Sequence, residues 1–159
     1  MDETGEPRLG VMLHAPTVDV AAVTDLCSLV ASWGSVVVAR AYADWTRPGL
    51  QGWFPLLCEH RIGLVQHFQT RPEHDPAMIA LALDAVEVTR VAALDGVVLA
   101  GNAGSLTPVI ARLHEAGARV VLAGPRGTPV QVRRWCDEFV YLDTRRAPTN
   151  QDRHGRHRA

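Results

Sequence analysis

Three histidines are placed where their side chains could do chemistry. His14 follows a short apolar run, and His67 and His74 come after another such run further along the chain. Three imidazoles can bind zinc if the fold brings them together. Their spacing matches no local zinc motif, and the three cysteines of the chain form no CxxC pair. The sequence therefore raises zinc binding as a hypothesis without favouring it.

Two aspartates stand at comparable positions. Asp44 follows the apolar run 35–43, and Asp75 precedes a long helical pattern that begins at Pro76. Carboxylates are the ligands that Mg²⁺ and Mn²⁺ prefer, so both aspartates, together with His14, are candidates for a metal site. In the simpler interpretation, both are turn or capping residues.

A glycine-rich corner with no acidic residue, Gly101 to Ser105, separates a predicted strand from a predicted helix. Ligands of open α/β folds bind beyond the carboxyl ends of the strands, where such a corner lies. The absence of any residue there that holds a metal or moves a proton is the feature that a functional interpretation has to explain.

Short β-branched runs alternate with longer helical patterns along the chain, which predicts a mostly parallel sheet of five to six strands with helices on both faces, an α/β three-layer sandwich. We expect Gly34 and Gly117 to end helices, Ser105 or Thr107 to cap one, and Thr128 to cap another. The predicted strands are 9–14, 35–43, 62–68, 95–101, 119–124 and 139–143, and the predicted helices are 19–34, 48–61, 76–93, 105–118 and 128–139.

Length and charge fit one domain. The chain has 159 residues and a formal net charge of −1, so no global field favours nucleic acid or membrane. We expect a flexible N-terminus at 1–8, a domain at 9–143 and a disordered basic tail at 144–159. The N-terminus is not a signal peptide and no apolar run is long enough to span a membrane, so we expect a cytoplasmic protein.

Longer motifs carry a family resemblance. The segments "ARAYADWTRPGLQGWFPLLCEHRIGLVQHF" (39–68), "MIALALDAVEV" (78–88), "LTPVIARLHEAGARVVLAG" (106–124) and "TPVQVRRWCDEFVYLD" (128–143) occur in this order. Together they resemble NYN domains, the LabA-like branch of the PIN-like ribonuclease superfamily, over about residues 9–143. The resemblance implies a PIN-like fold and a crevice where carboxylates hold Mg²⁺ or Mn²⁺ for cleavage of RNA.

The acids that the family uses are replaced in this chain. Where the resemblance places acidic residues, the sequence has His14, Pro16, Met78, Ala103 and Ser105. Neutral side chains of these types do not hold a hard divalent ion. We therefore expect no metal cofactor and no confident catalytic residue, and we interpret the chain as a catalytically degenerate domain that binds RNA or regulates another protein.

The candidates for contact with RNA phosphates are Arg40, Arg47 and Arg71, with Ser105 and Thr128 at helix N-termini. The basic tail either adds phosphate contacts or only keeps the chain soluble.

Two alternatives remain open. The chain could be an active endoribonuclease that uses Mg²⁺ or Mn²⁺ on relocated acids, Asp44 and Asp75. It could instead be a protein-interaction module or a homodimer without a nucleic-acid role, acting through Trp45, Trp53 and Phe54. The two tryptophans match positions in the family motif, which favours a packing role for them.

Overall fold

The structure, a computed structural model, describes residues 1–142 apart from the side chain of Ala103. The predicted tail, 144–159, and the last residue of the predicted domain lie outside the described residues. Within the described range, no helix is long and apolar enough to cross a bilayer.

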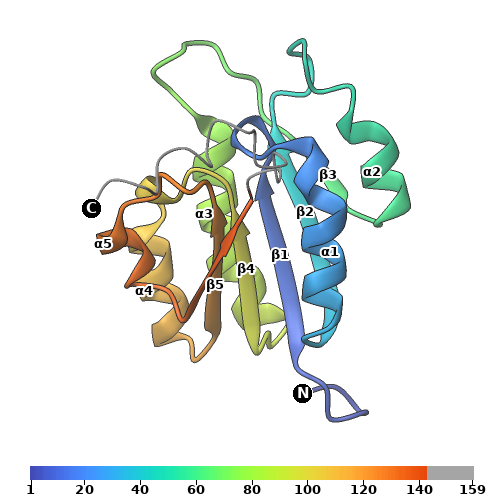
Figure 1. Ribbon diagram of the computed structural model, residues 1–159, viewed down its shortest axis with the longest axis vertical. Coiled ribbons are helices and arrows are strands. Elements are labelled where there is room, and N and C mark those ends of the chain that lie inside the picture. Colours follow the sequence, from blue (N-terminus) through green and yellow to red (C-terminus); the bar gives the residue numbers. More distant parts are fainter. Residues whose placement is uncertain (143–159) are drawn as a thin grey trace, which may run out of the picture.

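A six-stranded sheet forms the centre of the molecule, in the order β3-β2-β1-β4-β5-β6 (Figure 1). All five strand pairings are parallel. The predicted α/β class with a parallel sheet is confirmed. The strands are β1 (Arg8–His14), β2 (Ser35–Ala43), β3 (Gly63–Gln66), β4 (Gly96–Ala100), β5 (Arg119–Gly124) and β6 (Glu138–Tyr141).

Helices cover both faces of the sheet, as predicted. One core contains α1 and α2 packed on one face, and a second core contains α3 and α4 on the other, with residues around α5 at its margin (Figure 1). The helices are α1 (Val23–Ala31), α2 (Trp53–Glu59), α3 (Pro76–Val91), α4 (Thr107–Glu115) and α5 (Val130–Arg133), with short 3-10 turns at Ala15–Thr17 (η1), Val20–Ala22 (η2) and Ala103–Ser105 (η3).

Alternation along β1 shows how the two cores form. Leu13 points into the core with α1, whereas Met12 points into the core with α3 and α4, and both side chains are fully buried. Consecutive residues of a strand face opposite sides, so a strand covered on both faces must be apolar throughout. This buried pattern fixes the register of β1 and places its last residue, His14, at the carboxyl edge of the sheet.

Two helices that were predicted from periodicity are shorter than expected. The range 19–34 begins with η2, capped by the Asp19 side chain, and α1 ends at Ala31. Gly34 does not end a helix; a Cβ there would collide with the carbonyl oxygen of Pro7, so the glycine allows a close approach of two segments. The predicted range 48–61 contains α2 only from Trp53, because a turn with Gly49 at φ +90° precedes it.

The predicted caps of the last two helices are wrong. Leu106 is the N-cap of α4 and no side chain caps that helix, although Gly117 does follow its end at φ +82° as predicted. Pro129, not Thr128, is the N-cap of α5, which has only four residues. Four residues after α5, the side chain of Asp137 accepts a hydrogen bond from the backbone N–H of Val120 on β5 at 2.7 Å.

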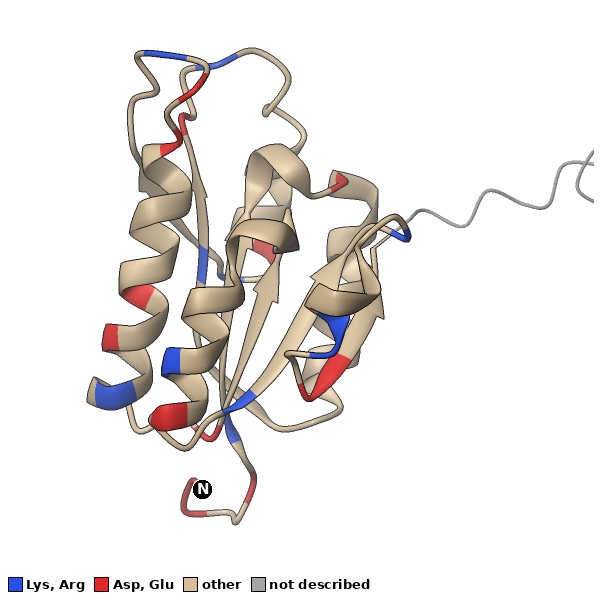
Figure 2. Ribbon diagram, turned by 90° about the vertical axis from the view of Figure 1, so that its left-hand side faces the viewer, with Lys and Arg blue, Asp and Glu red and all other residues tan. Residues whose placement is uncertain are grey.

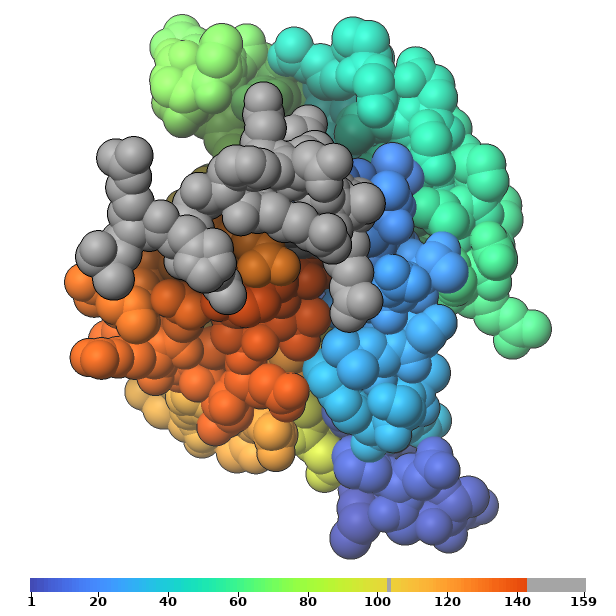
Figure 3. Space-filling model, viewed as in Figure 1, coloured from blue at the N-terminus to red at the C-terminus, as the bar shows by residue number. Residues whose placement is uncertain are grey.

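The N-terminal residues form a hydrogen-bonded turn. The backbone N–H of Asp2 donates to the carbonyl oxygen of Glu6, and the terminal amino group lies 2.8 Å from Asp95 Oδ2. This turn projects from the amino end of the sheet (Figure 3). The carboxyl ends of the strands, where ligands of this architecture bind, lie at the opposite edge.

Candidate functional site

His14 lies at the centre of the candidate site, at the carboxyl end of β1, and is only 2% exposed. Its Nδ1 atom is 2.7 Å from the hydroxyl oxygen of Thr17, which in turn accepts a hydrogen bond from the backbone N–H of Asn102 at 2.9 Å. These contacts join the end of β1 to the corner that follows β4. Thr17 thus connects the glycine-rich corner to His14, at the place where the family pattern has acidic metal ligands.

The other ring nitrogen of His14 faces a carboxylate. Nε2 lies 2.8 Å from Oδ2 of Asp75, a distance within ion-pair range. The direction of the ring N–H does not meet hydrogen-bond geometry, so Nε2 is buried without a well-formed hydrogen bond to any described residue. The contact is therefore electrostatic, and it links β1 to the start of α3.

Burial makes His14 neutral near pH 7. Desolvation lowers the pKa of the imidazole, and the Asp75 carboxylate opposes that shift only in part. The single proton of the Thr17 hydroxyl has two acceptors within reach, the carbonyl oxygen of His14 at 3.3 Å and Nδ1 of the same residue at 2.7 Å. On the other side of the ring, the Asp75 carboxylate can only accept, so its contact with Nε2 favours the tautomer with the proton on Nε2.

Asp75 caps α3. Its Oδ1 atom accepts a hydrogen bond from the backbone N–H of Met78 at 3.1 Å, while its Oδ2 atom faces His14. Pro76 occupies the first position of the helix, as predicted, where its missing N–H costs nothing. Both oxygens of the carboxylate are therefore already engaged within the protein.

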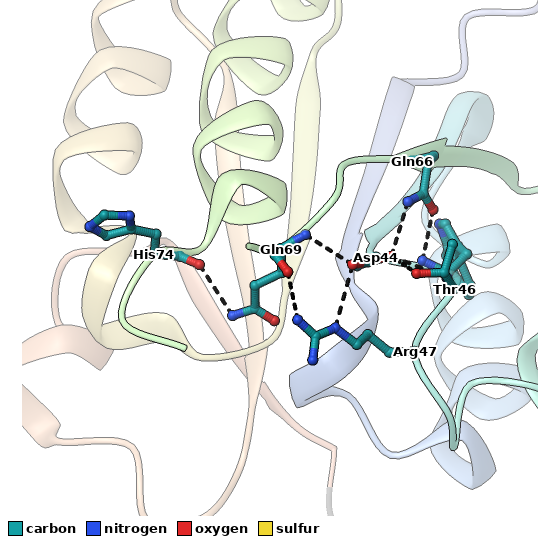
Figure 4. Close-up of polar contacts among 7 residues, drawn as sticks. Asp44, Thr46, Arg47, Gln66, Gln69 and His74 are labelled. Carbon is teal, nitrogen blue, oxygen red and sulfur yellow. Dashed lines mark hydrogen bonds and ion pairs between the residues drawn. The ribbon is translucent and has the colours of Figure 1, made fainter. Parts of the chain in front are cut away.

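Asp44 is engaged in a separate network (Figure 4). Its oxygens accept hydrogen bonds from the backbone and hydroxyl of Thr46, from Gln66 Nε2 at 3.0 Å and from the backbone N–H of Gln69 at 2.9 Å. The guanidinium of Arg47 lies 3.5 Å away and also donates to the carbonyl oxygen of Gln69. We call Asp44, Thr46, Arg47, Gln66 and Gln69 the Asp44 network.

Hydrogen bonding holds the Asp44 carboxylate ionised. The Thr46 hydroxyl contributes most, followed by Gln69 and Gln66, and together they keep the pKa of Asp44 well below its usual range. The network fastens the loop after β2 to the loop after β3. Its geometry matches the turn role that the sequence offered for Asp44.

The residues present do not fit the divalent metal that the family pattern implies. His14 and Asp75 do meet, but Asp44 does not join them, and neither do His67 and His74. Among residues 1–142, no three His, Cys, Asp or Glu side chains are grouped so that they could hold a metal ion. Mg²⁺ and Mn²⁺ require several oxygen ligands, whereas Asp75 is the one carboxylate that the described residues place beside His14.

The five predicted phosphate contacts differ in their surroundings. Arg71 and Ser105 are exposed near the carboxyl edge, and Arg47 lies there within the Asp44 network. Arg40 instead forms an ion pair with Asp84 on α3 at 3.2 Å. Thr128 is buried, and its hydroxyl donates to the carbonyl oxygen of Pro125.

Some polar contacts were not anticipated from the sequence. The hydroxyl of Tyr42 donates to Asp84 at 2.8 Å, and burial together with this contact raises the pKa of Tyr42. Gln66 lies in the predicted strand 62–68 and Gln69 follows that strand, and no contact was predicted for either side chain. Gln66 ends β3 and Gln69 comes just after it, next to the acid that follows the neighbouring strand β2. This arrangement is the signal that could have revealed the Asp44 network.

The comparison of the chain with known families agrees with the fold. The family model of the NYN domain matches residues 12–143. This chain belongs to the NYN family. No curated protein sequence matches it.

Two solved structures share the fold of this NYN domain. A protein of unknown function from Vibrio parahaemolyticus has a TM-score of 0.70 at 18% identity, with 90% of this chain and 97% of that chain covered. MurG from Acinetobacter baumannii has a TM-score of 0.55 at 16% identity, with 90% of this chain but 43% of that chain covered. At these identities, the similarity establishes the fold alone.

Proposed function

We propose that this NYN domain binds RNA at the carboxyl edge of its sheet and does not cleave it by metal-dependent hydrolysis. The observation that carries the proposal is the set of side chains at this edge. His14, Met78 and Ser105 stand where the family pattern has acids, and Asp75 is engaged with His14 and with the start of α3. A crevice of this kind offers no set of free carboxylates to a divalent ion.

Electrostatics supports an anionic ligand at this edge. Carboxylates that bind a metal repel phosphate when the metal is absent, and their replacement removes that repulsion. Arg47 and Arg71 lie in the loops after β2 and β3, and Arg47 forms an ion pair with the ionised carboxylate of Asp44. Figure 2 shows basic and acidic residues together in the loops at this end of the molecule. An RNA phosphate would meet guanidinium groups in this region without needing a bridging ion.

The direct test measures binding and cleavage of one labelled single-stranded RNA by the full chain. We expect binding that weakens with salt, persists in EDTA and produces no cleavage when Mn²⁺ is added. Arg71→Ala should weaken binding and lower the salt dependence, whereas Arg90→Ala, an equally charged change at the far end of α3, should not.

Two outcomes would point to the alternatives. Mn²⁺-dependent cleavage that is lost in Asp75→Asn would establish an active nuclease with relocated acids and overturn the proposal. No binding and no cleavage, together with a molecular mass that rises with concentration, would favour a protein-interaction module.

A further inference from the structure

An exposed aromatic ring stands beside the proposed RNA-binding edge. Phe68 follows β3, and its side chain is 67% exposed. The residues on either side of it are fixed. The backbone N–H of His67 donates to the carbonyl oxygen of Ala43 at 3.1 Å, and that of Gln69 donates to Asp44.

The Asp44 network therefore holds the backbone of Phe68 while leaving its ring in solvent. Gln66 adds two further bonds to the loop after β2, one accepted from the backbone N–H of Trp45 at 2.7 Å and one donated to Asp44. A ring on an anchored backbone loses little conformational freedom when a ligand stacks on it.

Guanidinium groups flank this ring along the chain. Arg47 donates to the carbonyl oxygen of Gln69, the residue next to Phe68, and its side chain is 52% exposed. Arg71 lies three residues after Phe68 and is exposed. In the space-filling view, the loop after β3, in light green, projects from the molecule (Figure 3).

From this arrangement we infer that Phe68 is a stacking platform for an unpaired base of single-stranded RNA, with Arg47 and Arg71 on the neighbouring phosphates. Proteins that bind single strands combine aromatic faces with cationic groups in this way, because every base has a π-face and every nucleotide a phosphate. The inference rests on the proposed RNA binding and adds to it the base contact and the preference for unpaired RNA.

The test uses the full chain and a dye-labelled single-stranded oligoadenylate, with a duplex of the same length as a second ligand. Phe68→Ala should weaken binding of the single strand by about tenfold, within the range that loss of one stacked aromatic produces, and should change duplex binding little. Phe68→Trp should keep the affinity, since it retains an aromatic face. Phe68→Leu should lose it, although an apolar side chain remains.

Leu83→Ala is the matched control. Leu83 lies on α3, is also 67% exposed, and is not part of the Asp44 network. Its loss should leave RNA binding unchanged. If the unmodified chain binds no RNA, both the proposed function and this inference fail. If it binds RNA and Phe68→Ala or Phe68→Leu binds equally well, only the stacking role of Phe68 is overturned.

Discussion

Gly101→Ala tests whether glycine at this corner is needed for the close approach of the segment after β4 to the end of β1. Gly101 has φ +136°, a conformation that is essentially restricted to glycine. A Cβ at this position would lie 2.7 Å from the hydroxyl oxygen of Thr17 and 2.9 Å from Cβ of His14. The substitution therefore adds backbone strain and also pushes apart the residues that join the corner to the sheet.

The two effects can be given magnitudes. A side chain in such a backbone conformation costs on the order of 1–3 kcal/mol. The overlap with Thr17 and His14 adds about 1–3 kcal/mol, typical of overpacking. We expect Gly101→Ala to lower the free energy of unfolding by about 2–6 kcal/mol, measured by urea denaturation at pH 7.

Two other glycines separate the contributions. Gly117 has φ +82° but nothing within 4 Å of an added Cβ, so Gly117→Ala should cost only about 1 kcal/mol. Gly104 has neither a positive φ nor a contact closer than 3.7 Å, so Gly104→Ala should change stability by less than about 0.5 kcal/mol. A loss in Gly101→Ala no larger than that in Gly117→Ala would refute the close approach of the corner to His14.

Three further outcomes are expected. Burial lowers the pKa of His14, so as pH falls the unfolded chain binds a proton at this residue before the folded chain does. The stability that the neutral ring contributes is therefore present above about pH 6.5 and is lost as pH falls through the folded pKa. Urea midpoints measured against His14→Gln and NMR titration of the ring would show this loss. Asp44 also has a lowered pKa, so the stability that its ionised carboxylate contributes is complete above about pH 4 and is lost on further acidification. The free energy of unfolding of Asp44→Asn should therefore be lower than that of the unmodified chain at pH 7, and the difference should shrink in acid. Tyr42→Phe, which removes the hydrogen bond to Asp84, should cost about 1 kcal/mol by thermal or urea unfolding, and no measurable loss would mean that Arg40 alone satisfies the carboxylate.

The sheet was predictable because its strands are short apolar runs, and the central ones, β1, β4 and β5, are buried along almost their whole length. The run 119–124 and the run 35–43 were both predicted with the bounds that the structure has. Continuous β-branched sequence between turn residues leaves few alternatives once helical patterns alternate with it. The sequence also predicted that Asp75 is a turn or capping residue and that Pro76 begins the helix, because these roles depend on local sequence alone.

The predictions that were wrong or missing concern features that depend on contacts between segments far apart in the sequence. The segment after α5 is held by the hydrogen bond between Asp137 and Val120, and Gly34 allows a close approach to Pro7. Neither partner is near in sequence. The meeting of His14 with Asp75 could be offered only as a hypothesis, because periodicity does not say which side chains at a sheet edge face one another.

Whether the carboxyl edge of this NYN domain binds a divalent metal is measured by calorimetric titration of the full chain with Mn²⁺. We expect heats of dilution only, with the same trace for Asp75→Asn. Saturable binding of one or two ions per chain that is abolished by Asp75→Asn would show that the domain has a metal site.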